Sequence, residues 1–225
     1  MLYRFIISAK NGGKQHGFTI AVIGCGMIGR EHIERIQNRI KDAEVVAVCD
    51  VFEEGAKKGA EIAGGKVKVY TDFHEAINDP DVTAVVVTTP GAFHKEPVIA
   101  AIEAGKPVFS EKPLANTAAD CKAVVDAEMA SGKHLVQVGF MRRYDRGYRQ
   151  VKELIDSGKF GAPMVIKCTH RADGVAPDYT TAMAVTDTAI HEIDVLPWLV
   201  GDEWDEVQCI MPKSSSKAHE GLKDP

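Results

Sequence analysis

Between residues 19 and 140, six short apolar runs alternate with segments of helical periodicity, and this alternation constrains the fold more than any other feature of the chain. The apolar runs are 19–24, 44–50, 66–70, 83–89, 106–112 and 134–140. Strands joined through helices pair in parallel, and parallel sheets are covered by helices on both faces. The pattern therefore predicts an α/β domain built on a doubly wound parallel sheet.

The ends of the expected helices carry suitable capping residues. Asp72 is followed by an acidic residue three positions later, as is Thr117, and this spacing is typical of a helix start. Gly105 follows the apolar periodicity of 94–104 and predicts a helix end. In the segment 27–40, Ile33, Ile36 and Ile40 recur at helical spacing, which predicts one buried face.

The rhythm changes after residue 140. We expect a helix at 145–158, a strand at 163–171, a helix at 187–200 and a strand at 206–212. This change predicts a first domain at 19–142 and a second domain at 143–225. Residues 1–18 contain one short apolar patch without a signal-peptide pattern, so we interpret them as a leader of unknown role.

Composition excludes several classes of protein. The net charge is -5 with no dense cluster of Lys and Arg, which is unlike a nucleic-acid binder. No apolar run approaches the roughly 20 residues that span a bilayer. The five cysteines are widely spread without a C-x-x-C pair, so neither a zinc ribbon nor a redox pair is indicated. Reduced thiols in the cytoplasm are the simple interpretation.

The stretch "GCGMIG" carries the first chemical motif, Gly24-x-Gly26-x-x-Gly29, between a strand and a helix. Its glycines allow a tight turn and a close approach to a pyrophosphate, and the first helical turn, with Met27 and Ile28, offers N–H groups. Asp50 ends the next strand, 21 residues after Gly29, and would accept from ribose hydroxyls. The alternative is a glycine turn without a ligand.

The residues after Asp50 favour one cofactor over another. A 2′-phosphate at this strand end would meet the Asp50 carboxylate, and Val51 and Phe52 offer no cation to balance it. The sequence therefore favours NAD over NADP.

Two further polar stretches follow the fourth and fifth strands. They are "TTPGAFH", with Thr88, Thr89, Pro90 and His94, and "SEKP", with Glu111 and Lys112. Ligands of open α/β sheets bind beyond the carboxyl ends of the strands. Lys112 could hydrogen-bond a substrate hydroxyl and lower its pKa. The alternatives are a proline turn and a weak surface ion pair.

The stretch "DTAIHEID" carries the third candidate cluster. Asp187, His191 and Asp194 are spaced i, i+4 and i+7, so they would share one helix face, while Ile190 and Ile193 would point into a core. A His flanked by carboxylates is a candidate general base with an orienting partner. A solvated helix face with a chance histidine remains the alternative.

Together, "AVIGCGMIG", Asp50, "TTP…H", "SEKPLA", "VGFMRRYD" and "DTAIHEIDVL" resemble the glucose–fructose oxidoreductase and inositol dehydrogenase family. The resemblance runs from about residue 19 to the end of the chain. "GFMRRYD" and "HEID" resemble more narrowly those members that oxidise myo-inositol. It implies a Rossmann domain that binds NAD, followed by an α+β domain with an open sheet.

The resemblance also implies roles for particular residues. Lys112, Asp187 and His191 would be catalytic, and Met141, Arg142 and His170 would line the polyol site. Backbone groups of Thr88–Pro90, together with His94 and Glu111, would face the nicotinamide. The family's chemistry needs no metal. The resemblance further implies a homo-oligomer formed through the second-domain sheet.

The resemblance leaves three hypotheses. The first is NAD-dependent oxidation of a cyclic polyol, myo-inositol to its 2-keto inosose. The second is a sister dehydrogenase for a sugar. Family members continue past "AHEGLKDP", so the chain is also interpreted as truncated, and the third hypothesis is an NAD-binding chain without turnover. We expect NAD binding, weak inositol oxidation and self-association.

Overall fold

The computed structural model describes residues 17–171, 174–177, 179–211, 213 and 222–223. The chain forms two compact units, Met1–Gly139 and Phe140–Pro225, and each is treated by itself. The expected leader at 1–18 lies almost wholly outside the described residues. None of the helices in the described part of the chain combines the length and apolar composition needed to cross a membrane.

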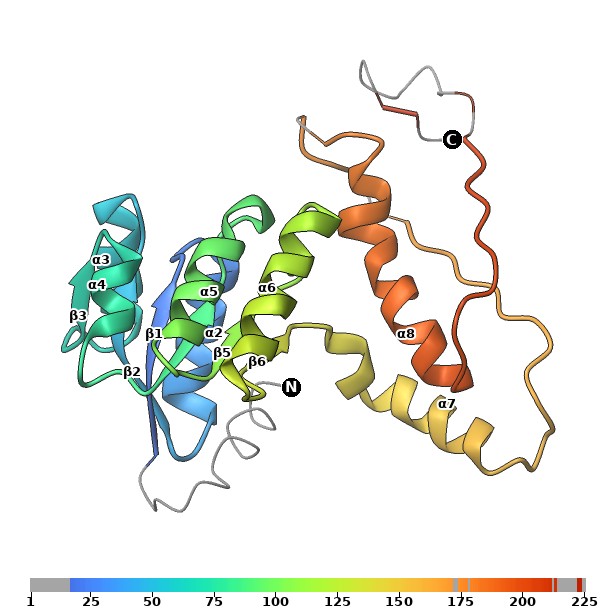
Figure 1. The fold of residues 1–225 in the computed structure, drawn as a ribbon, viewed down its shortest axis with the longest axis horizontal. Helices are drawn as coiled ribbons and strands as arrows, with labels where there is room; N and C mark the ends of the chain where they lie inside the picture. The colour runs from blue at the N-terminus through green and yellow to red at the C-terminus, as the bar shows by residue number, and fades with distance from the viewer. Residues whose placement is uncertain (1–16, 172–173, 178, 212, 214–221, 224–225) are drawn as a thin grey trace. The chain divides into compact units, whose positions relative to one another are not determined.

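Unit 1 is the predicted parallel α/β sheet (Figure 1). Its strands lie in the order β3-β2-β1-β4-β5-β6, and every neighbouring pair is parallel. The strands are β1 (Phe18–Ile23), β2 (Ala43–Cys49), β3 (Lys68–Tyr70), β4 (Ala84–Val87), β5 (Val108–Ser110) and β6 (Val136–Val138). The order reverses between β1 and β4, and ligands of such sheets bind at that point.

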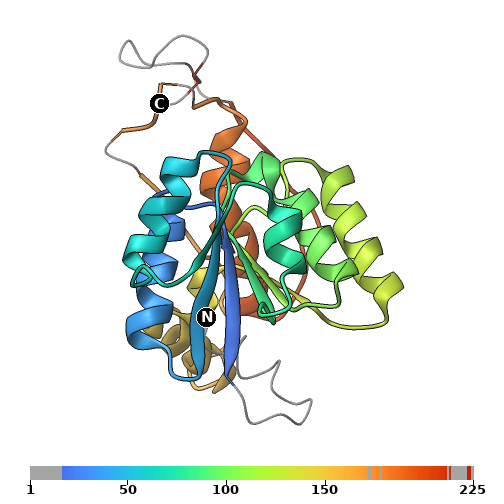
Figure 2. The same ribbon diagram turned by 90° about the vertical axis from the view of Figure 1, so that its left-hand side faces the viewer.

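Helices cover both faces of this sheet, as Figure 2 shows. They are α2 (Met27–Arg39), α3 (Glu53–Ile62), α4 (Phe73–Asn78), α5 (Lys95–Glu103) and α6 (Ala118–Ser131), with a short 3-10 turn, η2 (Gly91–Phe93). α2 and α3 pack on one face, and α4, α5 and α6 pack on the other.

The alternation of side chains along β1 explains the two layers. Ile20 and Val22 point into the core beneath α2 and α3, whereas Ala21 and Ile23 belong to the core on the other face. Of the three isoleucines at helical spacing, Ile33 and Ile36 are buried, and Ile40 follows the helix end with partial burial. A strand buried on both faces reads as a continuous apolar run, as this one does.

The predicted caps form. The Asp72 carboxylate accepts from the N–H of His74 at 2.7 Å, and the Thr117 hydroxyl accepts from the N–H of Asp120 at 3.1 Å. Gly105 has φ +66° just after α5, the left-handed conformation that a glycine tolerates best. These local contacts satisfy N–H groups that a helix start otherwise leaves without partners.

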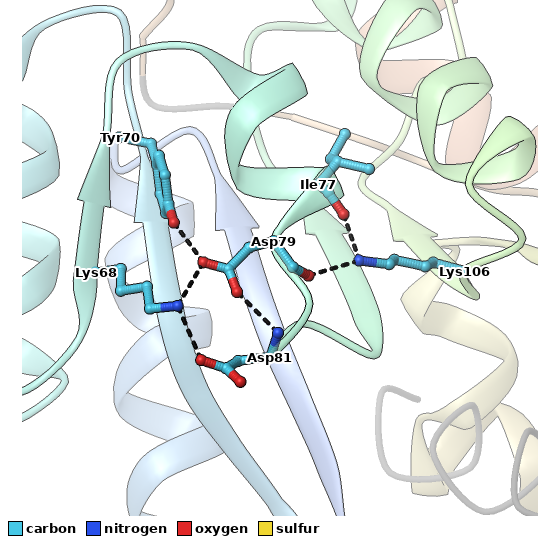
Figure 3. A network of polar contacts seen from close by, with 6 residues as sticks. All are labelled: Lys68, Tyr70, Ile77, Asp79, Asp81 and Lys106. Carbon is cyan, nitrogen blue, oxygen red and sulfur yellow. Dashed lines mark hydrogen bonds and ion pairs between the residues drawn. The ribbon is translucent and has the colours of Figure 1, made fainter.

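Both edges of the sheet are three-residue strands held by charged side chains. At the β3 edge, Asp79 accepts from Lys68 at 2.7 Å and also from Tyr70, while Lys106 donates to the Asp79 carbonyl at 2.9 Å (Figure 3). At the β6 edge, the Glu128 carboxylate accepts from the N–H groups of Leu135 and Val136, each at 2.7 Å.

The regular secondary structure in the described residues of unit 2 is helical. It contains a 3-10 turn, η3 (Met141–Tyr144), α7 (Arg146–Asp156), a π-helical segment, η4 (Ala184–Ala189), and α8 (Ile190–Val200). α7 confirms the helix expected at 145–158, and its start is capped by Asp145, which accepts from the N–H groups of Gly147 and Tyr148. α7 and α8 lie side by side, with the Lys152 ammonium 3.4 Å from the Leu199 carbonyl.

The strands expected at 163–171 and 206–212 are wrong for the described residues. Both segments are extended or irregular chain with exposed side chains, and neither pairs with another described segment. A strand is stabilised by its partners, so an apolar run without a partner does not become one. Residue 212 lies outside the described residues.

The helix expected at 187–200 also differs in detail. Its first part, which includes Asp187, is π-helical, and the α-helix begins only at Ile190. Ile193, predicted to face a core, is 46% exposed, and Val195 and Leu199 are buried instead. The wider π turn changes the face on which Asp187 lies relative to His191, compared with an α-helical count. Pro197 lies inside α8.

Candidate functional site

The glycine loop between β1 and α2 is packed at both of its ends. Gly24 has φ +95°, and a Cβ there would lie 2.6 Å from the Thr89 nitrogen. A Cβ on Gly29 would lie 1.9 Å from the Gly24 carbonyl oxygen. Only glycine fits at either position, because backbone atoms cannot move aside as a flexible side chain can.

The middle of the loop is different. A Cβ built on Gly26 meets nothing within 4 Å, although Gly26 is the N-cap of α2 and has an ordinary φ of -66°. Among the residues that the structure describes, none caps the helix at this end with its side chain. Met27, the first helical residue, is 69% exposed. The loop therefore leaves open space next to Gly26 at a helix N-terminus, where N–H groups and the helix dipole favour a phosphate.

Asp50, at the end of β2, holds this loop in place. One carboxylate oxygen accepts from the Cys25 N–H at 2.8 Å, and the other accepts from the Phe52 N–H at 3.0 Å. Each carboxylate oxygen can accept two hydrogen bonds, so one acceptor position on each remains for ribose hydroxyls. Val51 and Phe52 are exposed beside it. This arrangement fits the adenosine ribose of a dinucleotide.

The thiols of Cys25 and Cys49, near the loop, are uncharged at neutral pH. Burial, followed by the charge of Asp50, raises the pKa of Cys25 to about 12, and the same causes raise the pKa of Cys49 to about 12. A thiolate beside a pyrophosphate would repel it, and these thiols stay protonated at neutral pH. All five cysteines are free.

The residues after β4 contact the same glycine loop and hold it in place. Thr88 is buried, and its hydroxyl donates to the Gly24 carbonyl at 2.6 Å. The Thr89 hydroxyl donates to the Phe93 carbonyl at 3.2 Å, and Pro90 is exposed at the start of η2. The side chain of Thr88 is thus used to hold the glycine loop, which leaves backbone groups of this segment to meet a ligand.

His94 contacts both the segment that follows β4 and the segment that follows β5. It is 1% exposed, and its ring nitrogens lie 2.6 Å from the carbonyl oxygens of Thr89 and Pro113. A carbonyl oxygen only accepts, so both contacts are hydrogen bonds when both nitrogens carry a proton. The ring therefore links the backbone segments that follow β4 and β5, and both of its nitrogens are used in these contacts.

Glu111 and Lys112 follow β5, next to the β4 segment in the sheet. The Lys112–Pro113 peptide bond is cis. Glu111 lies 2.8 Å from His32 on α2, through Oε1 and Nε2, and its other oxygen accepts from the Lys112 N–H at 3.3 Å. Sequence reasoning missed His32, which lies three residues after Gly29 on the same side of α2.

Unit 2 gathers a polar cluster from three of its segments. Glu192 on α8 accepts from Arg142 of η3, and its second oxygen lies 3.5 Å from Nδ1 of His170. Arg142 lies 3.4 Å from the same ring nitrogen. The ring of His191 is 6.3 Å from that of His170, between centroids. The structure thus brings together Arg142, His170 and His191, three of the predicted site residues of this unit.

Glu192 is the residue at the centre of this cluster, and sequence reasoning did not single it out. Burial acts to raise its pKa, but the hydrogen bond and charge of Arg142 outweigh burial and hold the pKa below its usual range. A half-buried carboxylate kept ionised by an arginine can orient neighbouring groups. Its position next to His191 in "HEID" was the available clue.

The remaining predicted site residues of unit 2 lie in η3, in the π-helical segment and in α8. Met141 is exposed in η3, and Asp187 is half-buried in the π-helical segment. Asp194, expected on the face of His191, instead accepts from Arg143 at 2.6 and 2.9 Å. Asp194 is therefore committed to a bidentate pair with η3.

A hollow between α5 and α6 lies away from the glycine loop. It is lined by Ile102, Gly105, Ala127, Ser131 and Leu135, among others. These residues lie at the amino ends of β5 and β6, whereas ligands of such sheets bind at the carboxyl ends. This hollow is therefore not part of the candidate site.

Comparison with known families gives two matches along the chain. Residues 18–140 match the family model described as "Oxidoreductase family, NAD-binding Rossmann fold", and residues 148–224 match the model of the GFO/IDH/MocA C-terminal domain. The first match confirms the Rossmann fold and the NAD cofactor predicted from the glycine loop and Asp50.

Individual relatives are longer than this chain. The inositol 2-dehydrogenase of Azotobacter vinelandii is 53% identical over 207 residues, which are 92% of this chain and 61% of the relative. That of Klebsiella pneumoniae strain 342 is 50% identical with the same coverage. The chain thus spans about three fifths of the length of the relatives that it matches.

Solved structures show the same relationship. The myo-inositol dehydrogenase of Lactobacillus casei, in complex with NAD(H) and myo-inositol, superposes with a TM-score of 0.88 at 43% identity, over 93% of this chain and 62% of that one. The apo scyllo-inositol dehydrogenase of the same organism gives a TM-score of 0.70 at 28% identity, over 84% and 56%.

Proposed function

Because the chain belongs to the glucose–fructose oxidoreductase and inositol dehydrogenase (GFO/IDH/MocA) oxidoreductase family, we propose that it is part of an NAD-dependent dehydrogenase of cyclic polyols. Its substrate is myo-inositol, oxidised to the 2-keto inosose. The identity of about 50% to inositol 2-dehydrogenases supports this substrate over a sugar. The observation that carries the proposal is the open, uncapped glycine loop at Gly26 beside Asp50.

We assign residues 19–142 to cofactor binding and residues 143–225 to the substrate. On the cofactor side, N–H groups of Met27, Ile28 and Gly29 hold the pyrophosphate, and Asp50 and Val51 lie against the adenosine ribose. Thr88, Thr89, Pro90, His94 and Glu111 shape the nicotinamide side. On the substrate side, Met141, Arg142 and His170 contact the polyol.

In the proposed mechanism, NAD supplies a hydride acceptor when bound. His191 removes the proton of the reacting hydroxyl as a general base. The Lys112 ammonium donates to the same oxygen and stabilises the negative charge that develops there. Asp187 orients His191 or holds a neighbouring hydroxyl. The proton therefore ends on the imidazole, and the reacting carbon is oxidised to a ketone.

Gly26→Ala tests the cofactor site without disturbing the fold. The new methyl group has open space and an unstrained φ, so the melting temperature should stay within about 2 °C of wild type, a shift that corresponds to under ~1 kcal/mol in a chain of this size. The same methyl group would occupy the position that a pyrophosphate approaches. We expect calorimetric NAD affinity to fall at least ~10-fold, the equivalent of about 1.4 kcal/mol.

The control for this experiment is Asn38→Ala, at an exposed position near the other end of α2. It should bind NAD as wild type does. Unchanged NAD affinity in Gly26→Ala would contradict the loop's proposed role. The substrate is tested by following NADH formation with myo-inositol, scyllo-inositol and D-glucose, and preference for glucose would support the sister sugar dehydrogenase instead.

We also propose that the protein is cytoplasmic and forms homo-oligomers. Five free cysteines without a bonded pair support a reducing compartment. Apolar side chains of Met164, Val165, Val207 and Ile210 are exposed in unit 2, which supports association of copies. Sedimentation of wild type against a Val165→Lys, Ile210→Lys variant tests the second point, and a monomeric wild type would contradict it.

A further inference from the structure

A buried histidine on the phosphate-binding helix is paired with a carboxylate after β5. His32, on α2, is 4% exposed, and its Nε2 lies 2.8 Å from Oε1 of Glu111. The ring packs edge-on against Phe109 of β5, with centroids 5.6 Å apart. The pair therefore fastens α2 to the strand whose end carries Lys112.

The chemistry of the pair sets its hydrogen-bond pattern. An ionised carboxylate only accepts, so Nε2 of His32 carries the proton of this bond. Nδ1 is buried and has no hydrogen-bond partner among the described residues. A neutral ring leaves one acceptor without a partner there, whereas a protonated ring would bury an unsatisfied donor that carries charge. The bond to Glu111 is thus the one polar contact that fixes the ring in the described structure.

Glu111 is held from three sides. His32 donates to one oxygen, and the Lys112 N–H donates to the other at 3.3 Å. Gly139 closes the third side, because a Cβ there would lie 3.1 Å from the carboxylate. A carboxylate confined in this way fixes the direction of the backbone that leads into Lys112.

The strand order of the sheet indicates which half of a dinucleotide would lie near the His32–Glu111 pair. Asp50 ends β2, on one side of β1, whereas Glu111 follows β5, on the other side beyond β4. A dinucleotide lies across the point where the order reverses, with its pyrophosphate at α2. With the adenosine ribose at Asp50, the nicotinamide half lies toward β4 and β5.

We propose that His32 is a positioning residue for the nicotinamide half of the cofactor. It holds Glu111, and through Glu111 the start of the Lys112 segment, at a fixed place relative to the helix that binds the pyrophosphate. The proposal rests on the proposed binding of NAD, and it does not depend on which polyol is oxidised. A merely structural pair would instead stabilise the fold without distinguishing between halves of the cofactor.

The test compares two probes that share the adenosine half, NADH and ADP-ribose, by calorimetry on the full chain. His32→Phe keeps the packing on Phe109 and removes the hydrogen bond. We expect its NADH affinity to fall about 10-fold, the size expected for loss of one hydrogen bond to a charged group, while ADP-ribose affinity stays within about two-fold. His32→Gln keeps a donor and should recover most of the NADH affinity.

Two further variants complete the design. Glu111→Gln should reproduce the selective loss for NADH, and combining it with His32→Phe should add little, because both remove the same interaction. His74→Gln, at an exposed site on α4, is the control and should bind both probes as wild type does.

Equal losses for NADH and ADP-ribose, or no loss for NADH, would overturn the proposal. If His32→Phe fails to fold, the comparison rests on His32→Gln and Glu111→Gln, and a Glu111→Gln variant with unchanged NADH affinity would overturn it equally. A wild-type chain that binds neither probe would contradict the proposed function itself. Binding of both probes with oxidation of a sugar in place of inositol would contradict only the substrate, and binding without any turnover would support the third hypothesis, an NAD-binding chain without turnover.

Discussion

The carboxylate of Asp50 accepts a hydrogen bond from the backbone N–H of Cys25, 2.8 Å away in the middle of the glycine loop. The residue expected to bind the adenosine ribose therefore also fixes the loop expected to bind the pyrophosphate. Changing Asp50 will alter both the selectivity and the geometry of the site, and the two effects need separate variants.

Cofactor preference should follow the charge at Asp50. Replacing Asp50 by Ser together with Val51→Arg removes a carboxylate that repels a 2′-phosphate and adds a cation that attracts it. We expect the ratio of kcat/KM for NADP over NAD to rise at least ~10-fold, about 1.4 kcal/mol in relative transition-state binding. Asp50→Asn is the comparison, since it removes the charge and keeps one acceptor for the Cys25 N–H, although its amide nitrogen cannot accept from the Phe52 N–H. A wild type that already prefers NADP would show that the interpretation of Asp50 is wrong.

Turnover should depend on Lys112 and His191 while cofactor binding does not. Lys112→Met and His191→Ala each remove a group that handles the hydroxyl proton or the charge left on oxygen. Groups of this kind contribute ~10²–10⁴-fold, so in a full-length context kcat for myo-inositol should fall by that factor with NAD affinity unchanged. Lys122→Met, on an exposed position of α6, is the matched control. Retention of turnover within a few-fold of wild type in either variant would refute the assignment of that residue.

Loss of the Glu192 charge should affect the polyol and leave NAD unaffected. Glu192→Gln weakens the bonds that orient Arg142 and His170, so we expect KM for myo-inositol to rise roughly 10-fold, as for one charge-assisted hydrogen bond. Calorimetry should give the wild-type affinity for NAD. The control is Glu153→Gln, exposed on α7. An unchanged KM would mean that the cluster around Glu192 has only a structural role.

The stability of unit 1 should decline in acid through Asp79. Hydrogen bonds from Lys68 and then from Tyr70 lower the pKa of this carboxyl from 3.8 to about 2, against the opposing effect of burial. Because the folded pKa is the lower one, the contribution is complete above pH ~4 and is lost as the pH falls toward 2. A shift of this size corresponds to about 2 kcal/mol.

Asp79→Asn should therefore lower the melting temperature by roughly 4–8 °C at neutral pH, and the difference from wild type should shrink near pH 2. Asp81→Asn provides the comparison, because Asp81 also meets Lys68 but is 67% exposed and should change little. Scanning calorimetry at several pH values measures both. A gap between wild type and Asp79→Asn that does not depend on pH would contradict this account.

The sequence predicted unit 1 well because its determinants are local. Apolar runs such as 19–24 and 83–89, and caps such as Asp72 and Thr117, act within a few residues of chain. The glycine loop was predictable for the same reason, since the motif and its strand–helix context are contiguous.

The misses have a common physical cause. His32 meets Glu111 across 79 positions of sequence, and Arg142 meets Glu192 across 50, so neither pair shows in any local pattern. The strand expected at 163–171 does not form for a related reason. Its apolar alternation indicates only a local preference for extended chain, whereas a strand also needs a pairing partner from a distant part of the sequence. The π-helical segment around Asp187 likewise could not be predicted from sequence spacing, because that spacing was interpreted with the period of an α-helix.

The short, charged edges of the sheet in unit 1 bear on how the protein behaves when concentrated. Lys68 and Asp79 occupy one edge, and Glu128 takes up two backbone N–H groups at the other. A further strand arriving at β6 would have to displace the Glu128 carboxylate from the two N–H groups that it occupies. Edge-to-edge addition of copies at this side of the sheet is thereby disfavoured, and ordered assembly of the protein should use a different surface.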